Sequence, residues 1–458
     1  MKSLQRRKAH VGTLRGMMSM LTTRIHAASR RRLTAAVAGL TLAAGALVPA
    51  LAAAPADAAV NAPGNFTGFA FDACTAPTQA QMDAWWVSSP FGAVGIYISG
   101  SSRACAQPNL TRSWVTTQAS RGWRLLPIHV GMQAPCYAGN KQKMSSDPAT
   151  ARSQGVLAAN ESVTAATALA IGRGSTLTLD IEWYPISNAA CNAAVIEFVH
   201  GWSSRIAQHG YRSGLYSSAS AAIRTMNNLR NASVSGYHYP DALWFGWYNG
   251  KANLKAEPYL DDRYWVDGKR IHQYVGNAVT RYNGVTINID RNVMDIGSGS
   301  TTKKPKAQCG TPSVSKYRYI RRNQRRADLV PEAKCLLKQR GYYKGSTSGT
   351  KFGAKAQRAI NRYRAARGWA KTGTISRKVW VSLLSGNSAP VLKRGSTGQN
   401  VYKLQRSLTA ALARSVPRNG LFDATTERAV LDYRKRVKLP GWRTAEPQLW
   451  AALRAGKR

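Results

Sequence analysis

The sequence is poor in acidic residues and in metal-binding patterns. It has 21 Asp plus Glu against 65 Lys plus Arg, a formal net charge of +44 over 458 residues. Its six cysteines form no Cys-x-x-Cys pair, and its seven histidines show no His-Glu-x-x-His or similar spacing. We therefore expect no metal and no cofactor. A Gly-x-Ser-x-Gly elbow and a phosphate-binding glycine loop are also missing, which disfavours serine-hydrolase and nucleotide chemistry.

Long apolar runs are rare too. The one such run, residues 35–54, follows a basic segment without acids (1–33) and precedes Ala56-Asp57-Ala58. This order predicts a signal peptide over 1–58 and no transmembrane span in the mature protein. Ser29-Arg-Arg-Arg-Leu33 resembles a twin-arginine signal, with a general secretory signal as the alternative. We expect a secreted protein, extracellular or associated with the cell wall.

The cysteines agree with an oxidising compartment. They fall into two groups of even number: Cys74, Cys105, Cys136 and Cys191, then Cys309 and Cys335. Disulfide bonds are the better interpretation. Three pairings are open to the first group and one to the second, and we favour nearest neighbours.

The positive charge is concentrated near the carboxyl terminus. Residues 303–458 hold 37 of the 65 basic side chains and 6 of the 21 acidic ones. Such a segment attracts polyanions in a salt-dependent way. For an exported protein these would be anionic wall polymers, and we expect no specific nucleic-acid partner. A Gly/Ser/Thr-rich and then basic stretch, 297–315, is typical of a linker that precedes this segment.

The part before the linker, 64–296, shows the pattern of an α/β barrel. Eight β-rich runs recur at 66–72, 93–99, 124–131, 176–183, 211–217, 242–248, 270–275 and 285–290. Helical segments separate the first six, near 77–88, 109–121, 148–171, 189–209 and 218–229. The count predicts a modified (β/α)8 TIM-type barrel. Its last connections are too short for helices, so we expect loops or a hairpin there.

Side-chain alternation along these strands places acids together. In Thr176–Glu182, Asp180 and Glu182 share the face opposite the leucines, which must point into the barrel. The same parity turns Asp72 and Asp290 inward at the carboxyl ends of the first and last strands, the rim where barrel enzymes place catalytic groups. Crowding should raise the pKa of at least one acid. One protonated and one ionised carboxyl are what glycosidic hydrolysis needs.

Aromatic residues near the same strand ends could bind sugar rings. We predict this role for Tyr97, Trp183, Tyr216, Trp247 and Tyr248, with ordinary packing as the alternative for each. His129 and His272 lie nearby in sequence; a structural role is the commoner one for such residues, with contact to the pocket as the alternative.

Four blocks carry a family resemblance: FTGFAFDACTAPTQAQMDAWW, VGIYISGSSRACAQPNLTRSWV, GWRLLPIHVGMQAPC and LTLDIEWY. They resemble a bacterial glycoside-hydrolase-like family of unknown function whose mycobacterial member is exported by the twin-arginine route. That family is related to the family 25 lysozymes. The resemblance implies Glu182 as general acid, Asp180 as its partner, and Asp72 and Asp290 as supporting acids. Gln273 matches a Trp-Gln-Tyr block in which His272 here replaces the Trp.

The basic segment is a repeat. Phe352, Ala359, Tyr363, Trp380 and Leu383 recur 70 positions later as Phe422, Ala429, Tyr433, Trp450 and Leu453. The pattern predicts a small all-α duplicated domain with helical repeats at 328–385 and 390–455. LKRGSTGQNVYKLQRSL, NGLFDATTERAVLDYRKR and LWAAL resemble the peptidoglycan-binding domain of wall hydrolases. Where that family has an aromatic residue followed by Gln, this chain has an aromatic residue followed by Arg, at Tyr363-Arg364 and Tyr433-Arg434.

These patterns lead to one hypothesis and two rivals. The first is a secreted, wall-associated glycoside hydrolase of the lysozyme or muramidase type, acting on peptidoglycan or a related envelope glycan by carboxylate acid/base chemistry. Its partners would be the wall glycan and anionic wall polymers. The second is a non-catalytic protein that binds wall carbohydrate. The third is an extracellular polyanion binder for which the barrel is a scaffold.

Overall fold

The structure, a computed structural model, describes residues 59–300, 309 and 317–458. The predicted signal peptide, 1–58, and most of the predicted linker lie outside the described residues. The barrel and the helical repeats are both described.

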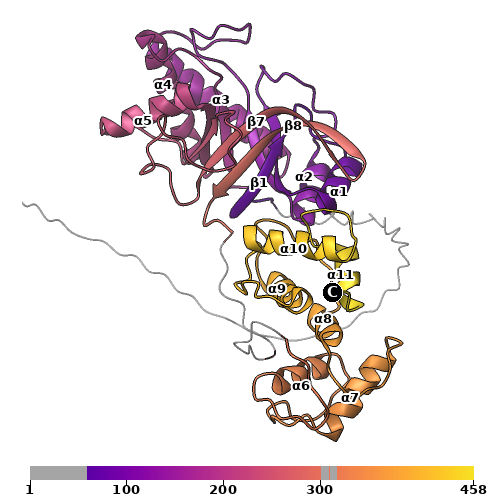
Figure 1. Cartoon of the computed structure of the whole chain (residues 1–458). Coiled ribbons are helices and arrows are strands. Elements are labelled where there is room, and N and C mark those ends of the chain that lie inside the picture. The colour runs from indigo at the N-terminus through magenta and orange to yellow at the C-terminus, as the bar shows by residue number, and fades with distance from the viewer. Residues whose placement is uncertain (1–58, 301–308, 310–316) are drawn as a thin grey trace, which may run out of the picture. The chain divides into compact units, whose positions relative to one another are not determined.

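Eight strands close into a barrel in the order of the sequence. Their bounds are β1 Phe66–Asp72, β2 Phe91–Ser99, β3 Arg124–His129, β4 Thr176–Asp180, β5 Arg212–Ser218, β6 Ala242–Gly246, β7 Lys269–Tyr282 and β8 Val285–Ile296. Neighbours from β1 to β7 run parallel, whereas β8 is antiparallel to both β7 and β1 (Figure 1). The predicted modified barrel is confirmed.

Helices connect the first six strands, and α1 to α4 each begin at a capping side chain. They are α1 Gln79–Ser88, α2 Arg112–Arg121, α3 Pro148–Ala168, α4 Ala189–Gln208, the π-helix η1 Ala219–Ile223 and α5 Arg224–Asn231. Thr78 and Gln81 form a capping box at α1, and Asp147 caps α3 just before a proline. One helix was predicted near 218–229. Ala221 has non-helical backbone angles (φ −109°, ψ −119°), so a kink in η1 interrupts this segment before α5.

Strand alternation separates two hydrophobic layers. Leu177, Leu179 and Ile181 lie in the core between the barrel and its helices. Ala70 and Trp244 belong to a second cluster that fills the barrel interior. Polar residues at the inward-facing positions of the strands therefore point into the barrel, above this packed apolar layer.

The final two strands form the expected hairpin, but they are longer than predicted. Asn283 (φ 46°) and Gly284 (φ 80°) make its turn in the left-handed region. β8 then returns along β1, and the two strands pair Asp72 with Asp290. The prediction that Asp290 ends its strand is therefore wrong. It lies within an antiparallel strand and reaches the same rim as Asp72 because the strand direction is reversed.

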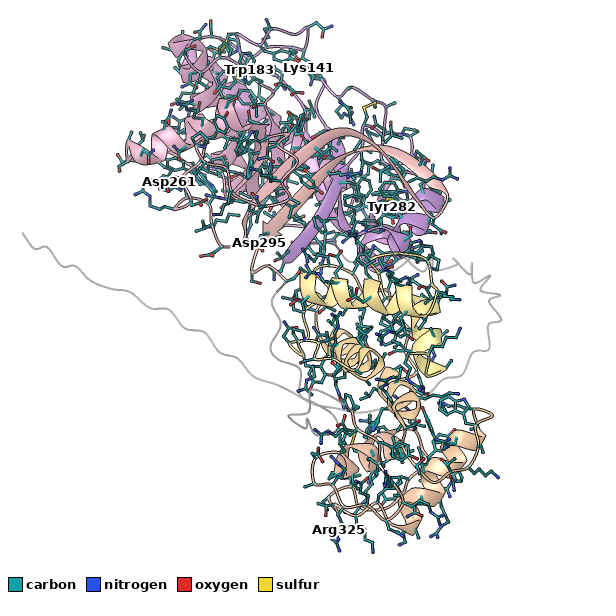
Figure 2. All side chains as sticks on the ribbon, in the orientation of Figure 1. Lys141, Trp183, Asp261, Tyr282, Asp295 and Arg325 are labelled. Atoms are coloured by element: carbon teal, nitrogen blue, oxygen red, sulfur yellow. A yellow bond between two sulfur atoms is a disulfide. The ribbon has the colours of Figure 1, made fainter. Side chains whose placement is uncertain are left out.

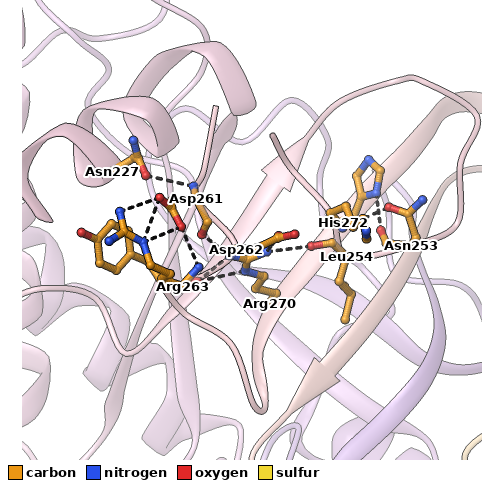
Figure 3. Close-up of polar contacts among 10 residues, drawn as sticks. Asn227, Asn253, Leu254, Asp261, Asp262, Arg263, Arg270 and His272 are labelled. Atoms are coloured by element: carbon orange, nitrogen blue, oxygen red, sulfur yellow. Dashed lines mark hydrogen bonds and ion pairs between the residues drawn. The ribbon is translucent and has the colours of Figure 1, made fainter. Parts of the chain in front are cut away.

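A buried arginine holds the long connection between β6 and β7. Arg270 donates to the carbonyl oxygens of Leu254 (3.0 Å), Asp261 (2.6 Å) and Tyr264 (2.5 Å), and pairs with Asp262 at 3.0 Å (Figure 3). Its side chain is only 5% exposed. Interactions with three carbonyls fix the loop without regular secondary structure.

The carboxyl-terminal domain is all-α. Its helices are α6 Val330–Gln339, α7 Ala354–Ala365, α8 Arg377–Ser385, α9 Gln399–Leu412, α10 Ala424–Arg436 and α11 Pro447–Arg454. Buried side chains of all six belong to one hydrophobic cluster. The helical part of the predicted fold is thus present.

The duplication is visible in matching contacts. Isolated bridges join Ile320 to Ile375 in the first half and Leu392 to Ala445 in the second. The indole of Trp380 donates to a backbone carbonyl at 2.8 Å, and that of Trp450 does the same at 2.8 Å. Each half is therefore built on the same plan of three helices.

The disulfides pair nearest neighbours as expected: Cys74–Cys105, Cys136–Cys191 and Cys309–Cys335. The helices of the described ranges are all too short or too polar to span a bilayer.

Candidate functional site

The four predicted acids line one cavity at the mouth of the barrel. Asp72 ends β1, Asp180 ends β4, Glu182 follows two residues later, and Asp290 lies in β8. The cavity has a volume of about 430 Å³. The geometry predicted from strand parity, with acids of separate strands in a common hollow, is confirmed.

Asp72 is buried and accepts hydrogen bonds from three side chains. Tyr97 Oη donates to Oδ1 at 3.0 Å, and Asn292 Nδ2 and Gln273 Nε2 donate to Oδ2 at 2.7 and 3.1 Å. Burial and then repulsion from Asp290 raise the pKa of Asp72 to about 7, although these three hydrogen bonds oppose the shift. The carboxyl is thus poised to change charge near neutral pH.

Gln273 joins two of the acids. Its Nε2 donates to Asp72 and, at 3.1 Å, to Asp290 Oδ2. Its Oε1 accepts from Tyr216 Oη at 2.7 Å and Tyr248 Oη at 3.0 Å, which fixes the orientation of the amide. Burial raises the pKa of Asp290, while a hydrogen bond from the backbone of Asn277 lowers it.

Asp180 is buried without a partner for one carboxyl oxygen. Its side chain is among the buried polar groups, and Oδ1 has no hydrogen-bond partner among the described residues. Burial, followed by the charge of Glu182, raises the pKa of Asp180 well above its usual value, whereas Lys141 lowers it. Asp180 therefore keeps its proton more readily than an exposed aspartate.

Glu182 has the opposite environment. Its side chain is 37% exposed, and Lys141 Nζ lies 2.7 Å from Oε1, which places a positive charge directly beside this carboxyl. Gln133 braces the backbone here: its Nε2 donates to the carbonyl of Asp180 at 3.0 Å, and its Oε1 accepts from Glu182 N at 2.7 Å. Neighbouring carboxyls thus occupy different protonation environments, as acid/base chemistry requires.

The predicted aromatic residues do not all reach the cavity. Tyr97 lines it, and Tyr216 is connected to the acids through Gln273. Trp183 lies outside the cavity lining with 52% of its surface exposed. Figure 2 shows Trp183 and Lys141 at the end of the barrel opposite Asp295.

Trp247 also lies outside the cavity lining. It packs against the outer core, and its ring centroid is 5.5 Å from that of Tyr259. Its backbone carbonyl accepts from His272 at 2.8 Å, so its structural role is to anchor the loop after β6.

Several polar residues of the site were missed from the sequence, and three of them contact the acids or the backbone that carries them. Lys141 and Gln133 come from the long connection between β3 and α3, which carries no periodic pattern. Asn292 lies in β8 beyond the predicted end of that strand, and its carbonyl oxygen accepts from Trp244 Nε1 at 2.8 Å. Continued alternation after Asp290 was the one signal that could have identified Asn292.

The histidines near the site are structural, as interpreted from the sequence. His129 is buried, lies 2.9 Å from Ser99 Oγ and packs near Trp202, and burial lowers its pKa to about 4. No three His, Cys, Asp or Glu side chains converge to hold a metal ion within the described ranges.

Residues 83–294 match the sequence model of the Rv2525c-like, glycoside hydrolase-like domain. The match contains Asp180, Glu182 and Asp290, and Asp72 precedes it. The resemblance of the barrel to a glycoside-hydrolase-like family is confirmed. No curated protein matches the chain.

Solved structures with a similar fold include proteins of three bacteria. An uncharacterized B. stearothermophilus protein is 20% identical, covering 50% of this chain and 95% of that one, with a TM-score of 0.32. The Clostridium perfringens spore cortex lytic enzyme SleM is 15% identical (50% and 67% covered, TM-score 0.32). The Streptococcus pneumoniae autolysin LytC, in complex with a synthetic peptidoglycan ligand, is 12% identical (50% and 46% covered, TM-score 0.33).

Proposed function

We propose that the protein is a secreted, wall-associated glycoside hydrolase that acts on peptidoglycan or a related envelope glycan. The observation that carries the proposal is the convergence of Asp72, Asp180, Glu182 and Asp290 on one cavity. The glycoside-hydrolase-like family match supports the reaction class. The three disulfides support an oxidising, extracellular location. The choice of glycan follows the sequence resemblances to lysozymes and peptidoglycan-binding repeats.

In this proposal the two neighbouring carboxyls divide the proton transfer. Glu182 is the more exposed and reaches the leaving oxygen, and in the free site Lys141 Nζ occupies its Oε1. Asp180 holds a proton because it is buried. When a sugar displaces Lys141, the Asp180 proton passes to Glu182 and from there to the glycosidic oxygen. The resulting Asp180 carboxylate then stabilises or attacks the developing cation.

The repeats are proposed to tether the enzyme to the wall. Their resemblance to peptidoglycan-binding domains and their excess of cationic side chains support binding to wall glycan or to anionic wall polymers.

A second candidate function, glycan binding without turnover, is favoured by the Lys141–Glu182 ion pair. While Lys141 contacts Glu182 Oε1, this carboxyl oxygen is not free to meet a leaving oxygen, and the cavity keeps its polar lining.

One experiment distinguishes the two candidates. Purified wild type, Glu182→Gln and Asp180→Asn are incubated with peptidoglycan, and reducing ends are measured. Loss of a positioned general acid typically lowers the rate by about 10²–10⁴-fold. Glu257→Gln, at an exposed carboxyl outside the cavity, is the matched control and should keep the wild-type rate. Equal release by wild type and Glu182→Gln would refute the hydrolase proposal, and wall binding without any release would support the second candidate.

A further inference from the structure

A cleft in the helical domain is lined almost entirely by cations. It has a volume of about 730 Å³ and lies where the first turn of α8, the last residue of α10 and the segment after α11 meet. Its lining residues are Arg377, Lys378, Arg436, Ala455, Gly456, Lys457 and Arg458. Five of the seven carry a positive charge, and acids are absent from this lining.

The backbone builds this arrangement. After α11, Gly456 adopts the left-handed region (φ 69°), and Lys457 N donates back to the carbonyl of Ala452 at 3.0 Å. Tyr433 Oη donates to the carbonyl of Lys457 at 3.1 Å. A Cβ on Gly456 would lie 2.6 Å from the carbonyl oxygen of Lys378, so the segment packs directly against α8. The cations of the two segments are held together by ordered main chain.

No acidic side chain of residues 317–458 lines the cleft. Five of the six acids between 317 and 458 pair with arginines outside it: Asp328, Glu332, Glu427, Asp432 and Glu446. The sixth, Asp423, caps α10. Within the cleft, Lys378 Nζ lies 4.4 Å from the ring centroid of Trp369, and Arg436 Nη1 donates weakly to a carbonyl. Five like charges therefore repel one another until an anion enters.

The lining selects among anions. Guanidinium groups from Arg377, Arg436 and Arg458 match phosphate oxygens in paired hydrogen bonds, and several cations in one cleft favour a ligand with repeated charges. Single-stranded nucleic acids additionally need aromatic platforms on which bases stack. The cleft lining includes no aromatic ring, and Lys378 occupies the face of Trp369.

We propose that this cleft is the binding site for a base-free phosphodiester polymer, such as a polyol-phosphate chain of the cell envelope. It deepens the proposed wall tethering by the repeats and names both the site and the ligand chemistry. It does not depend on glycan cleavage by the barrel.

The test uses the full chain and synthetic poly(glycerol phosphate), with binding measured by calorimetry over a series of salt concentrations. The cleft variant is Arg377→Gln/Arg436→Gln/Arg458→Gln. The matched control, Arg321→Gln/Arg358→Gln/Arg428→Gln, removes the same charge at exposed positions of the same domain outside the cleft. We expect the cleft variant to lose affinity by about tenfold or more, and the control by less than about threefold. Circular dichroism confirms that each variant is folded.

Other outcomes overturn the proposal in distinguishable ways. Equal losses of affinity in both variants would mean that diffuse charge alone attracts the polymer. This result would reject the cleft as the binding site but would leave the proposed wall tethering standing. Tighter binding of single-stranded DNA of equal charge would reject the ligand class. Absence of binding by the wild type would reject the polyanion tethering as well.

Discussion

The ammonium group of Lys141 lies 2.7 Å from Glu182 Oε1, at the cavity that also holds Asp180. Lys141 thus neutralises one carboxyl of the Asp-x-Glu pair and lowers the pKa of the other. Because the lysine comes from the connection between β3 and α3, this loop controls the charge of a site built on the strands.

Replacing Lys141 by Met should move the titration of Asp180 to higher pH. The substitution removes the positive charge that opposes the effect of burial and of Glu182. Carbon-13 NMR of labelled aspartate carboxyls measures this directly and needs no substrate. Lys143→Met, at an exposed neighbouring position, should leave the titration unchanged. If the titration curve of Asp180 were identical in Lys141→Met and wild type, the charge of Lys141 would have no effect on the pKa of this carboxyl.

Asp72 should make the barrel less stable as pH rises from about 4 to 7. Its pKa of about 7 in the folded protein exceeds the ordinary value of 3.8, so in this window the folded state holds a proton that the unfolded state releases. Each pH unit then costs at most about 1.4 kcal/mol of unfolding free energy from this group. The loss ends above the folded pKa.

Asp72→Asn should flatten this pH dependence, because the amide does not titrate. It should lower the stability most at pH 4.5, where wild type is free of the buried charge and the new amide faces three donors. Urea unfolding at pH 4.5, 6 and 7.5 measures both effects. Asp267→Asn, at an exposed position outside the cavity, should keep the wild-type slope. A slope unchanged by Asp72→Asn would assign the dependence to other groups.

The barrel could be predicted from the sequence because alternation is a local property of each strand. Burial of Leu177 and Leu179 against the helices forces Asp180 to the opposite face, whatever the rest of the fold does. The duplication of the helical domain was likewise readable from residues such as Trp380 and Trp450, whose contacts repeat in the structure.

What could not be predicted depends on loops and on strand direction. Lys141 and Gln133 reach the site from a segment without periodicity, and their roles arise from contacts made only in the folded chain. Trp183 follows the strand end, where alternation no longer fixes orientation, and it lies outside the cavity lining. Asp290 was assigned to the correct rim for an incorrect reason, because it was placed at the carboxyl end of its strand, whereas β8 continues to Ile296.

Arg270→Met should destabilise the barrel by about 2–4 kcal/mol. It leaves three loop carbonyls without their donor in a buried setting, while the methionine retains most of the apolar stem (Figure 3). Thermal unfolding monitored by circular dichroism measures the loss. Arg263→Met removes an exposed arginine whose pair with Asp261 is open to water, and it should leave the melting temperature nearly unchanged. Similar shifts in both variants would mean that the Arg270 contacts add little.

The two repeats offer an internal comparison at equivalent arginines. Arg364 and Arg434 both donate to carbonyls of the loop between the second and third helices of their repeat. Arg434 is fully buried and also pairs with Glu446 at 2.7 Å, whereas the first repeat has Ser376 at the position of Glu446. The second arginine therefore neutralises a buried carboxylate that the first repeat lacks.

Arg434→Gln should consequently cost about 3–5 kcal/mol, because the buried Glu446 loses its positively charged partner and keeps only backbone donors, and Arg364→Gln about 1 kcal/mol. Hydrogen exchange of the α9–α11 amides, compared with that of α6–α8, reports the loss in each half. Since the two substitutions are chemically identical, equal protection losses would show that the Glu446 ion pair contributes no net stability beyond the shared carbonyl contacts.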